Sequence, residues 1–408
     1  MRNELLSSSA ALAVLVVVGA CTARGPIVAG SSPAATSASP SPTPTATPVQ
    51  AGLGTWRLGP EMSSPRTDFA AVALPGGRVL LMGGESTFTT MTATVDIFDP
   101  TTNTIDPAAP MSTPRSGNTA TLLPNGKVLV VGGFSGPGVP ALASAEVYDP
   151  ATNTWTPVAA MNQPRAHHAA VLMGNGKVFV TGGEGGPGNP TPGASEIYDP
   201  NTNTWTAAQT VWGSRPNGTT ATVLKDGRVM VYGGVEQVQP GNQYEFYDPA
   251  TARATYGRFM GSGDTSYSTV ASLANGTVIV VGGEQTSNPS GALNATAIYD
   301  PALDVAGNAT ADAWSAGPAM NVGHCRHTMT TLRSGLLLVA GGRCGSSESI
   351  AVTELYDPTG KRWLPAAPLL YARGVHTAVL LPDGRVLVAG GSKIAAAITD
   401  TTEIYTPA

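Results

Sequence analysis

Residues 122–133 read LLPNGKVLVVGG, and variants of this stretch recur along most of the 408-residue chain. In each copy a turn dipeptide such as Asn125-Gly126 is followed by a short apolar run and then by two glycines. Asn-Gly and Asp-Gly between apolar runs are typical of a β-hairpin with a two-residue turn, in which both residues need positive φ. The stretch therefore predicts two antiparallel strands joined by a tight turn.

The glycine pairs repeat at intervals of 49, 50, 51, 49, 59 and 49 residues. Their first members are Gly83, Gly132, Gly182, Gly233, Gly282, Gly341 and Gly390. After each pair comes a variable loop and then a third strand that ends in an aromatic residue and usually Asp, as in VYDP at 147–150. A fourth strand often carries Trp. Four strands in about 50 residues predict one propeller blade, so the seven pairs predict seven blades.

Glycine pair, Tyr-Asp and Trp recur together from Gly54 to Ala408, and this combination resembles the kelch repeats. The resemblance implies an all-β, seven-bladed β-propeller of the kelch type. The last repeat stops after its third strand, whereas GTWRLGPEM at 54–62 has the character of a fourth strand. We therefore expect this N-terminal strand to complete the last blade, with Trp56 beside Tyr405, because closure removes exposed sheet edges.

The first 53 residues differ in character from the rest. An apolar run at 10–18 is too short to span a bilayer but suits the core of a signal peptide. It leads into VGAC at 18–21, which resembles a bacterial lipobox and implies cleavage before Cys21 and lipidation of that cysteine. The alternative is an ordinary signal peptide with an incidental cysteine.

Three parts are therefore expected: a lipoprotein-type signal peptide at 1–21, a disordered tether rich in Pro, Ser, Thr and Ala at 22–53, and the propeller at 54–408. We expect an exported monomer held at the membrane by its lipid, in an extracellular or periplasmic location that permits disulfides. With 12% charged residues and a net charge of −5, the chain lacks the basic character of nucleic-acid-binding proteins.

The segment GHCRH at 323–327 contains one of the chain's three cysteines. If Ser334-Gly335 is a two-residue turn, Cys325 lies directly opposite Cys344 across the hairpin. Facing residues in an antiparallel pair are close enough for a disulfide. We expect a Cys325–Cys344 disulfide, with a metal thiolate or free thiols as the alternatives.

The same register places one residue of every blade opposite the second glycine of its pair, where glycine would make room for the larger side chain. These equivalent residues are Phe69, Asn118, His168, Thr219, Ser268, His327 and His376. Kelch repeats often carry Arg-x-x-His here, which implies a histidine that packs against a neighbouring strand. The other interpretation is that the histidines converge on the channel mouth, where His327 and His376 of adjacent blades would bind a metal.

The mouth also receives the loops between the second and third strands, several of which begin with Glu. Carboxylates beside imidazoles suit a divalent ion or sugar hydroxyls. We expect a protein that binds a carbohydrate or protein ligand at this face and needs no cofactor. The candidate residues are Glu85, His167, His168, Glu184, Tyr267, Glu284, His324, Arg326, His327, Arg343 and His376.

Kelch propellers also include copper radical oxidases that resemble galactose oxidase. In that family two ligand tyrosines precede the equivalent position, and a histidine follows one of them. Only Tyr267 matches here, and Ser268 follows it; Val375 precedes His376. The alternative to a binding protein is thus an oxidase-like or sugar-isomerising enzyme with Tyr267, His327 and His376 around the channel and copper or calcium as its metal.

Two further sets of recurring residues suggest structural roles. Acidic residues two positions before the strand-three tyrosine, such as Glu146 and Glu196, are expected to pair with the arginine that opens strand one, such as Arg165. The aspartates that follow this tyrosine, such as Asp149, are expected to accept backbone N–H bonds in the next turn. The fifth repeat lacks both the Glu and the Arg.

Overall fold

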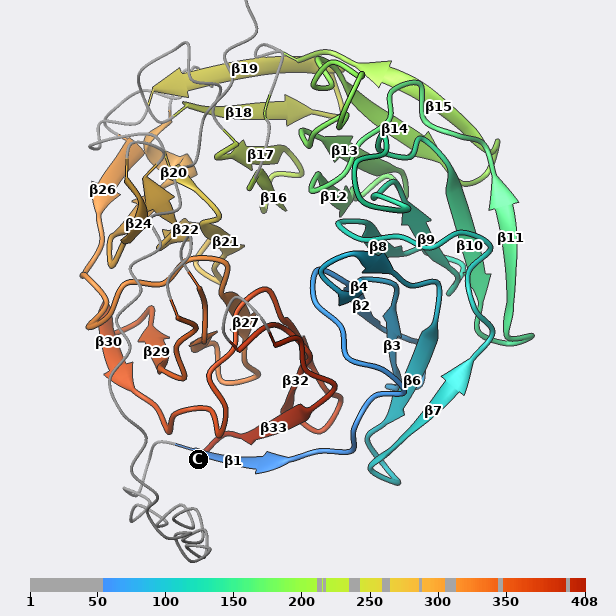
Figure 1. The fold of residues 1–408 in the computed structure, drawn as a ribbon. Helices are drawn as coiled ribbons and strands as arrows, with labels where there is room; N and C mark the ends of the chain where they lie inside the picture. Colours follow the sequence, from blue (N-terminus) through green and yellow to red (C-terminus); the bar gives the residue numbers. More distant parts are fainter. Residues whose placement is uncertain are drawn as a thin grey trace, which may run out of the picture. The chain divides into compact units, whose positions relative to one another are not determined.

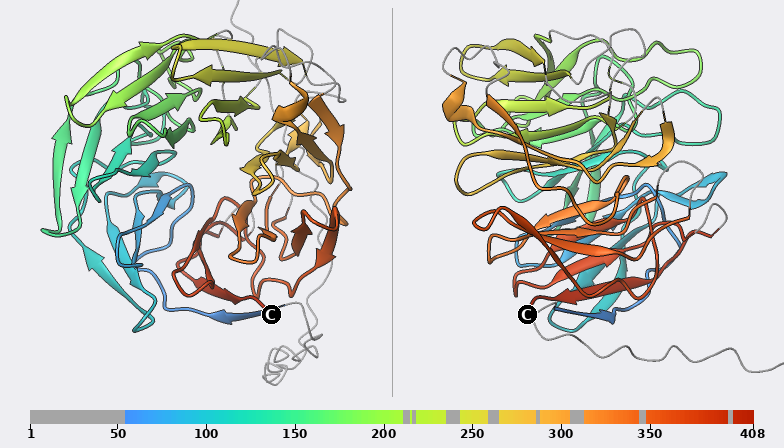
Figure 2. Two further views of the ribbon diagram at one scale, coloured as in Figure 1. Left: turned by 180° about the vertical axis from the view of Figure 1, so that it is seen from behind. Right: turned by 90° about the vertical axis from the view of Figure 1, so that its left-hand side faces the viewer.

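The computed structural model describes residues 54–210, 215, 218–234, 243–258, 265–285, 288–304, 313–343, 348–393 and 397–408. Seven four-stranded antiparallel sheets are arranged as blades around a central axis, which confirms the predicted propeller (Figure 1). In each blade the four strands follow one another from the centre of the ring to its rim (Figure 2). The described residues contain one short helix, the 3-10 turn η1 (Pro301–Leu303), and none long and apolar enough to span a membrane.

The blades are numbered along the chain, and each is given from its inner to its outer strand. Blade 1 consists of β2 (Ala70–Ala73), β3 (Val79–Met82), β6 (Val95–Asp99) and β7 (Thr104–Ala108). Blade 2 consists of β8 (Thr119–Leu122), β9 (Val128–Val131), β10 (Ala145–Asp149) and β11 (Thr154–Val158). Blade 3 consists of β12 (Ala169–Leu172), β13 (Val178–Thr181), β14 (Ser195–Asp199) and β15 (Thr204–Ala208).

Blade 4 consists of β16 (Thr220–Val223), β17 (Val229–Tyr232), β18 (Gln243–Asp248) and β19 (Arg253–Arg258). Blade 5 consists of β21 (Thr269–Ser272), β22 (Val278–Val281), β25 (Thr296–Tyr299) and β26 (Trp314–Ala316). Blade 6 consists of β27 (Thr328–Thr331), β28 (Leu337–Ala340), β29 (Thr353–Asp357) and β30 (Arg362–Pro365). Blade 7 consists of β31 (Thr377–Leu380), β32 (Val386–Ala389), β33 (Thr402–Thr406) and β1 (Thr55–Leu58). Two small sheets are formed by β4 (Glu85–Thr87) with β5 (Thr90–Met91), and by β20 (Thr265–Ser266), β23 (Glu284–Gln285) and β24 (Asn288–Ala292).

The ring is closed by β1, the first strand of the propeller, which pairs with β33 at its C-terminal end (Figure 1). Trp56 faces Tyr405, and the two ring centroids lie 5.0 Å apart, as predicted. The Trp56 Nε1–H donates a hydrogen bond of 2.7 Å to the Ala367 carbonyl oxygen, between blades 6 and 7. Trp155 makes the same bond to Ala109 between blades 1 and 2. The closing strand thus repeats the contacts that the fourth strands make elsewhere.

The hairpin turns between first and second strands are one residue longer than predicted, and the predicted register is therefore wrong by one. In blade 6, Thr328 pairs with Ala340, and the Leu332 N–H donates to Leu336 across a three-residue loop. In this loop Gly335 has φ of 84°, whereas Ser334 keeps negative φ. A three-residue loop with a glycine bulge needs only one left-handed residue. In blade 6 this residue is Gly335, so Ser334 before it need not be glycine.

The corrected register changes which residue faces Cys325 across the hairpin. Cys325 faces Arg343, whose N–H donates to the Cys325 carbonyl oxygen at 2.8 Å, so Cys325 is not directly opposite Cys344. Cys325 is fully buried and disulfide-bonded. Cys344 lies outside the described residues, and its pairing with Cys325 stays a prediction.

Among the described residues, six of the seven glycine pairs hold the next blade through one close backbone contact. The Gly133 N–H donates a 2.9 Å bond to the Arg165 carbonyl oxygen, and a Cβ on Gly132 would come within 2.3 Å of that oxygen. In the other blades the second glycine of the preceding pair donates the equivalent bond, and the acceptors are the carbonyl oxygens of Arg66, Arg115, Arg215, His324 and Arg373. Only glycine permits the approach, because any other residue would place an atom inside the neighbouring carbonyl.

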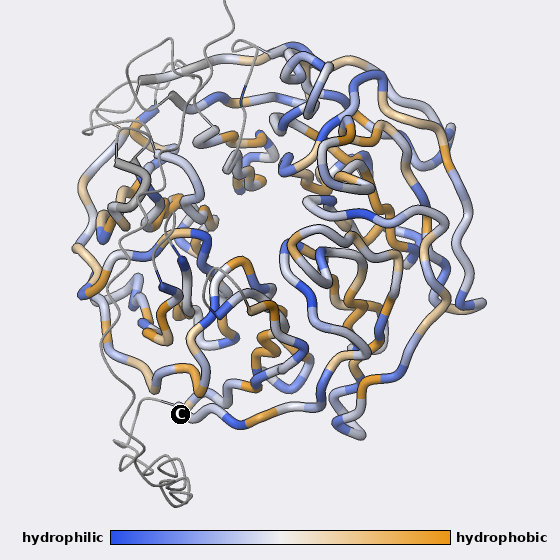
Figure 3. Tube along the Cα trace, viewed as in Figure 1, coloured by the Kyte–Doolittle hydropathy of each residue, from blue (hydrophilic) through white to orange (hydrophobic). Residues whose placement is uncertain are grey.

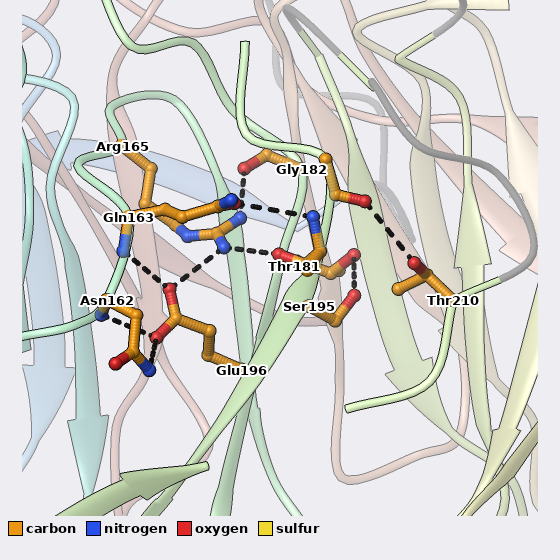
Figure 4. Close-up of polar contacts among 10 residues, drawn as sticks. Asn162, Gln163, Arg165, Thr181, Gly182, Ser195, Glu196 and Thr210 are labelled. Carbon is orange, nitrogen blue, oxygen red and sulfur yellow. Dashed lines mark hydrogen bonds and ion pairs between the residues drawn. The ribbon is translucent and has the colours of Figure 1, made fainter. Parts of the chain in front are cut away.

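Buried ion pairs fix the side chains of the same arginines, as predicted. Arg165 lies 3.1 Å from Glu196 and donates to the Gly182 carbonyl at 2.9 Å (Figure 4). Glu196 also accepts the backbone N–H bonds of Asn162 and Gln163, so it ties the connection between blades to the sheet. The matching pairs are Arg66–Asp96, Arg115–Glu146, Arg215–Glu245 and Arg373–Glu403. Blade 5 has Ala297 at the acidic position.

The predicted turn role of the strand-three aspartates is also confirmed. The Asp149 carboxylate accepts the Ala151 N–H at 2.9 Å, and the same bond recurs at Asp199, Asp248, Asp300 and Asp357.

Apolar side chains fill the space between blades, and apolar stretches of the trace lie within them (Figure 3). Seven buried clusters are found among the described residues, and each joins two neighbouring blades. One of them packs Leu80 of blade 1 against Val130 and Tyr148 of blade 2. The cluster between blades 7 and 1 includes Ile404 beside Phe98. Each blade is thus stabilised by both neighbours, and an unclosed ring would lose one whole interface.

Deleting residues 51–58 should lower the melting temperature by at least several degrees, because blade 7 loses its fourth strand and the bond from Trp56. The measurement is thermal unfolding followed by circular dichroism. Leu58→Ala provides the matched control, since the Leu58 side chain is 50% exposed and should tolerate truncation. An unchanged melting temperature for the deletion would contradict closure by β1.

Candidate functional site

A ring of left-handed residues lies at one mouth of the channel, one just before each innermost strand. The seven members are Asp68, Gly117, His167, Gly218, Tyr267, Arg326 and Val375, with φ between 49° and 76°. Left-handed backbone is uncommon outside glycine, yet five of these residues carry side chains. Backbone bonds join consecutive members, for example from the Gly117 N–H to Asp68 at 3.0 Å and from His167 to Gly117 at 2.8 Å. We call these residues the channel-mouth ring.

All seven ring residues line one cavity of about 480 Å³. This volume lies within the range of small-molecule sites. Eight of the predicted face residues also line it: Glu85, His167, His168, Tyr267, Arg326, His327, Arg343 and His376. Glu184 and Glu284 do not line the cavity, but each contacts a residue that does. Asp68 and Phe88 also line the cavity and were not among the predicted face residues.

One side of the cavity is acidic and is organised by His167. Its Nε2 lies 2.6 Å from Asp68 Oδ2, and its Nδ1 lies 2.7 Å from Glu184 Oε1. Asp68, followed by the hydrogen bonds and charge of Glu184, raises the pKa of His167 to about 10 despite its burial. The imidazole is therefore protonated at neutral pH and donates from both nitrogens. This cation holds carboxylates of two different blades in fixed positions.

Glu85 lies next to Asp68 on this acidic side. The Ser116 hydroxyl is 3.2 Å from a carboxylate oxygen of each. Burial and the charge of Asp68 raise the pKa of Glu85. Burial alone would raise the pKa of Asp68 as well, but His167 and Ser116 outweigh it and hold that pKa below its ordinary value. The two neighbouring carboxyl groups thus differ in acidity.

The opposite side of the cavity is basic. The Arg326 guanidinium lies over the Tyr267 ring, 3.8 Å from its centroid, and 3.6 Å from Glu284. Arg343 lines the same cavity, where burial and the charge of Arg326 lower its pKa. Burial raises the pKa of Tyr267, so its phenol stays protonated at neutral pH. Stacking on the phenol fixes the plane of Arg326.

His168, His327 and His376 are buried residues that bind the preceding blade. Their Nε2 atoms lie 2.8, 2.8 and 3.0 Å from the hydroxyls of Thr119, Thr269 and Thr328, respectively. Burial lowers the pKa of His168 and of His376 to about 3 and that of His327 well below its ordinary value. They are neutral, and the packing interpretation accounts for them.

Both glycines of each pair make room for these side chains. A Cβ on Gly132 would lie 2.8 Å from His168 Cε1 of the next blade, and a Cβ on Gly183 would lie 2.8 Å from His168 Cβ of its own blade. The second glycine therefore makes room for the histidine, as predicted. In the observed register, however, the residue directly opposite His168 is Gly182, the first glycine of the pair.

His324 was predicted at the binding face, and this is wrong. The side chain is fully buried; Nδ1 lies 2.7 Å from the Gly341 carbonyl oxygen, and Nε2 lies 3.5 Å from Glu354. In five other blades an arginine occupies this place. His324 is thus a substitute for the structural arginine of blade 6.

No curated protein matches the chain. Residues 55–234 match the KLHDC2/KLHL20/DRC7 Kelch-repeats domain. Among solved structures, a fungal alcohol oxidase of the AA5 family, in complex with copper, superposes with a TM-score of 0.69 at 21% identity, over 87% of this chain and 76% of that one. At this identity the likeness shows the fold alone.

The residues of the mouth do not fit a copper centre. Tyr267 is covered by a guanidinium cation, and both nitrogens of His167 are bonded to carboxylates. His327 and His376 each use Nε2 for a threonine. In the part of the chain that the structure describes, no three His, Cys, Asp or Glu side chains are grouped to hold a metal ion.

The blade count, the strand order and the family match agree on one conclusion. The chain is a seven-bladed β-propeller built of kelch repeats, with the fold of the galactose oxidase-like enzymes.

Proposed function

We propose that this propeller is a binding protein that takes a carbohydrate in the cavity at the channel mouth. The observation that carries the proposal is the lining of the cavity, which combines fixed carboxylates, fixed guanidinium groups and aromatic rings. Sugars present hydroxyls that both donate and accept, beside apolar C–H faces. A concave cavity of about 480 Å³ suits one or two sugar rings, whereas a protein ligand would need the wider and flatter face around it.

Each part of the lining has a defined role in this proposal. Asp68 and Glu85 accept hydrogen bonds from ligand hydroxyls, and Arg326 donates to ligand oxygens. Phe88, whose side chain is 43% exposed at the cavity, offers a ring for the C–H face of a sugar. Because His167 and Tyr267 already hold their neighbours, little side-chain freedom is lost on binding.

A second candidate function is acid–base isomerisation of the bound sugar. It is favoured by one observation: Asp68 and Glu85 share Ser116, while their pKa values are displaced in opposite directions. Such a pair divides the roles of base and acid. Ring opening of a hemiacetal needs one proton added to the ring oxygen and one removed from the anomeric hydroxyl, with no oxidant.

The proposal extends to location: the signal-peptide and lipobox features at 1–21 support export and lipidation at Cys21. The propeller would then bind its ligand outside the cytoplasm, at the end of the tether.

Binding to a panel of monosaccharides and disaccharides, measured by calorimetry, tests the main proposal. Asp68→Asn and Arg326→Gln should each weaken binding by about tenfold or more, because a charged hydrogen bond is lost. Asp226→Asn, at the opposite end of the blades, should bind as the wild type does. Failure of every sugar to bind would contradict the proposal, and interconversion of anomers faster than in buffer would favour the second candidate.

His167 should remain protonated to about pH 9 and lose its proton near pH 10, as followed by NMR of the imidazole nitrogens. Its folded pKa lies above its ordinary value of 6.5, so its stabilising contribution is full below about pH 6.5 and is lost as the pH rises through about 10. Asp68→Asn should return the midpoint toward 6.5. A wild-type midpoint near 6.5 would exclude the paired arrangement.

Cys21→Ser should release the protein from the membrane fraction into the soluble extract of the exporting compartment, because a single cysteine carries the lipid. Metabolic labelling with a radioactive fatty acid should mark the wild type only. A wild-type protein without label would overturn the anchor.

A further inference from the structure

We infer that Arg326 and Arg343 form an anion subsite of the mouth cavity, which takes the carboxylate of an acidic sugar. The inference rests on the proposed carbohydrate function and narrows its ligand class. It is carried by the hydrogen-bond state of these two side chains, which differs from that of the structural arginines.

The structural arginines have defined acceptors for their terminal nitrogens, although the Nε atoms of Arg66, Arg165 and Arg373 are shielded without a hydrogen bond. Arg115 and Arg373 each donate to two backbone carbonyls and to a carboxylate. By contrast, no side-chain hydrogen bond from Arg326 or Arg343 is formed with any residue that the structure describes, and the Nε atom of each is shielded from solvent. A guanidinium that is partly shielded and makes no hydrogen bond through any of its nitrogens is uncommon and calls for a missing partner.

The charges around the two groups point to an anionic partner. Among the described residues, Glu284 is the one carboxylate within 4 Å of the Arg326 guanidinium, and at 3.6 Å it is too far for a hydrogen bond. Arg326 also lowers the pKa of the more distant Asp68. Arg343 has no ion pair within the described ranges, and the nearby Arg326 repels its charge. An added carboxylate would accept from both guanidiniums and relieve this repulsion.

The two arginines are held from different segments that meet at the cavity. Arg326 is a member of the channel-mouth ring, and its plane is fixed by the Tyr267 ring. Arg343 directly follows the glycine pair of blade 6, where its N–H is bonded to Cys325 and its Cβ packs against Gly374. Such prearranged guanidiniums favour planar, bidentate recognition of a carboxylate.

The rest of the cavity selects the class of anion. Asp68, Glu85 and Glu184 make the facing side acidic, so a phosphate or a dianion would be repelled there. A ligand with one carboxylate and several hydroxyls satisfies both sides at once, with its carboxylate on the arginines and its hydroxyls on the acidic side. This describes a uronic acid or a similar sugar acid, free or at the end of a polysaccharide.

The test compares matched ligands by calorimetry on the full-length Cys21→Ser protein. Galacturonate, its neutral methyl ester and galactose differ at one group, as do the glucuronate counterparts. The acid should bind at least tenfold more tightly than both neutral forms, and added salt should reduce this difference. Oligosaccharides with a terminal uronate distinguish a polysaccharide end from the free sugar acid.

Arg343→Gln should abolish the preference for the acid while leaving the neutral sugar unaffected, and Arg343→Lys should retain part of it. Arg362→Gln, an exposed arginine of the same blade, is the control for net charge. Equal affinity for acid and neutral forms would overturn the subsite but leave the carbohydrate function standing. If no sugar of either kind binds to the folded protein, both are wrong.

Discussion

The close backbone contact found at six of the seven glycine pairs is the constraint on which the rest of the molecule depends. There the N–H of the second glycine binds a carbonyl of the next blade, at 2.7 Å between Gly391 and Arg66 for the contact that crosses the closure. The first glycine leaves room for that carbonyl and for the following side chain: a Cβ on Gly390 would lie 2.5 Å from the Arg66 oxygen and 2.6 Å from Phe69. The same contact, repeated around the ring, sets how near the blades approach one another.

This contact also builds the binding face. The residue two positions after the held carbonyl turns into the left-handed region in most blades, as Asp68 does after Arg66 and His167 after Arg165. The blade-holding residues and the cavity-lining residues are therefore neighbours in sequence but have separate tasks. The scaffold is repeated, while the identity of the ring residue differs from blade to blade. The cavity can thus acquire an acidic side and a basic side without disturbing the interfaces between blades.

Charge compensation on the two sides differs in kind. His167 balances Asp68 and Glu184 through hydrogen bonds of 2.6 and 2.7 Å, so the acidic side is already ordered. Arg326 has one carboxylate at 3.6 Å, and Arg343 has no ion pair with any described residue, so the basic side is charged but incomplete. An arrangement of this kind binds a ligand that carries its own anion, because the free protein holds the guanidiniums in place without satisfying them.

The sequence by itself determined the repeat, the seven blades, the closing strand with Trp56 and the Arg–Glu pairs, because each depends on a local pattern that recurs. It did not determine the hairpin register, since Asn-Gly suits both two-residue and three-residue loops, and only the packed sheet selects between them. It could not show that His324 replaces an arginine or that Asp68 faces the cavity, because left-handed backbone is uncommon at any non-glycine residue and Tyr, Arg and Val do not favour it. The Asp68–His167 pair joins residues 99 positions apart on blades 1 and 3. Only the closed ring brings them together, because their distance is set by the sum of all the contacts between blades.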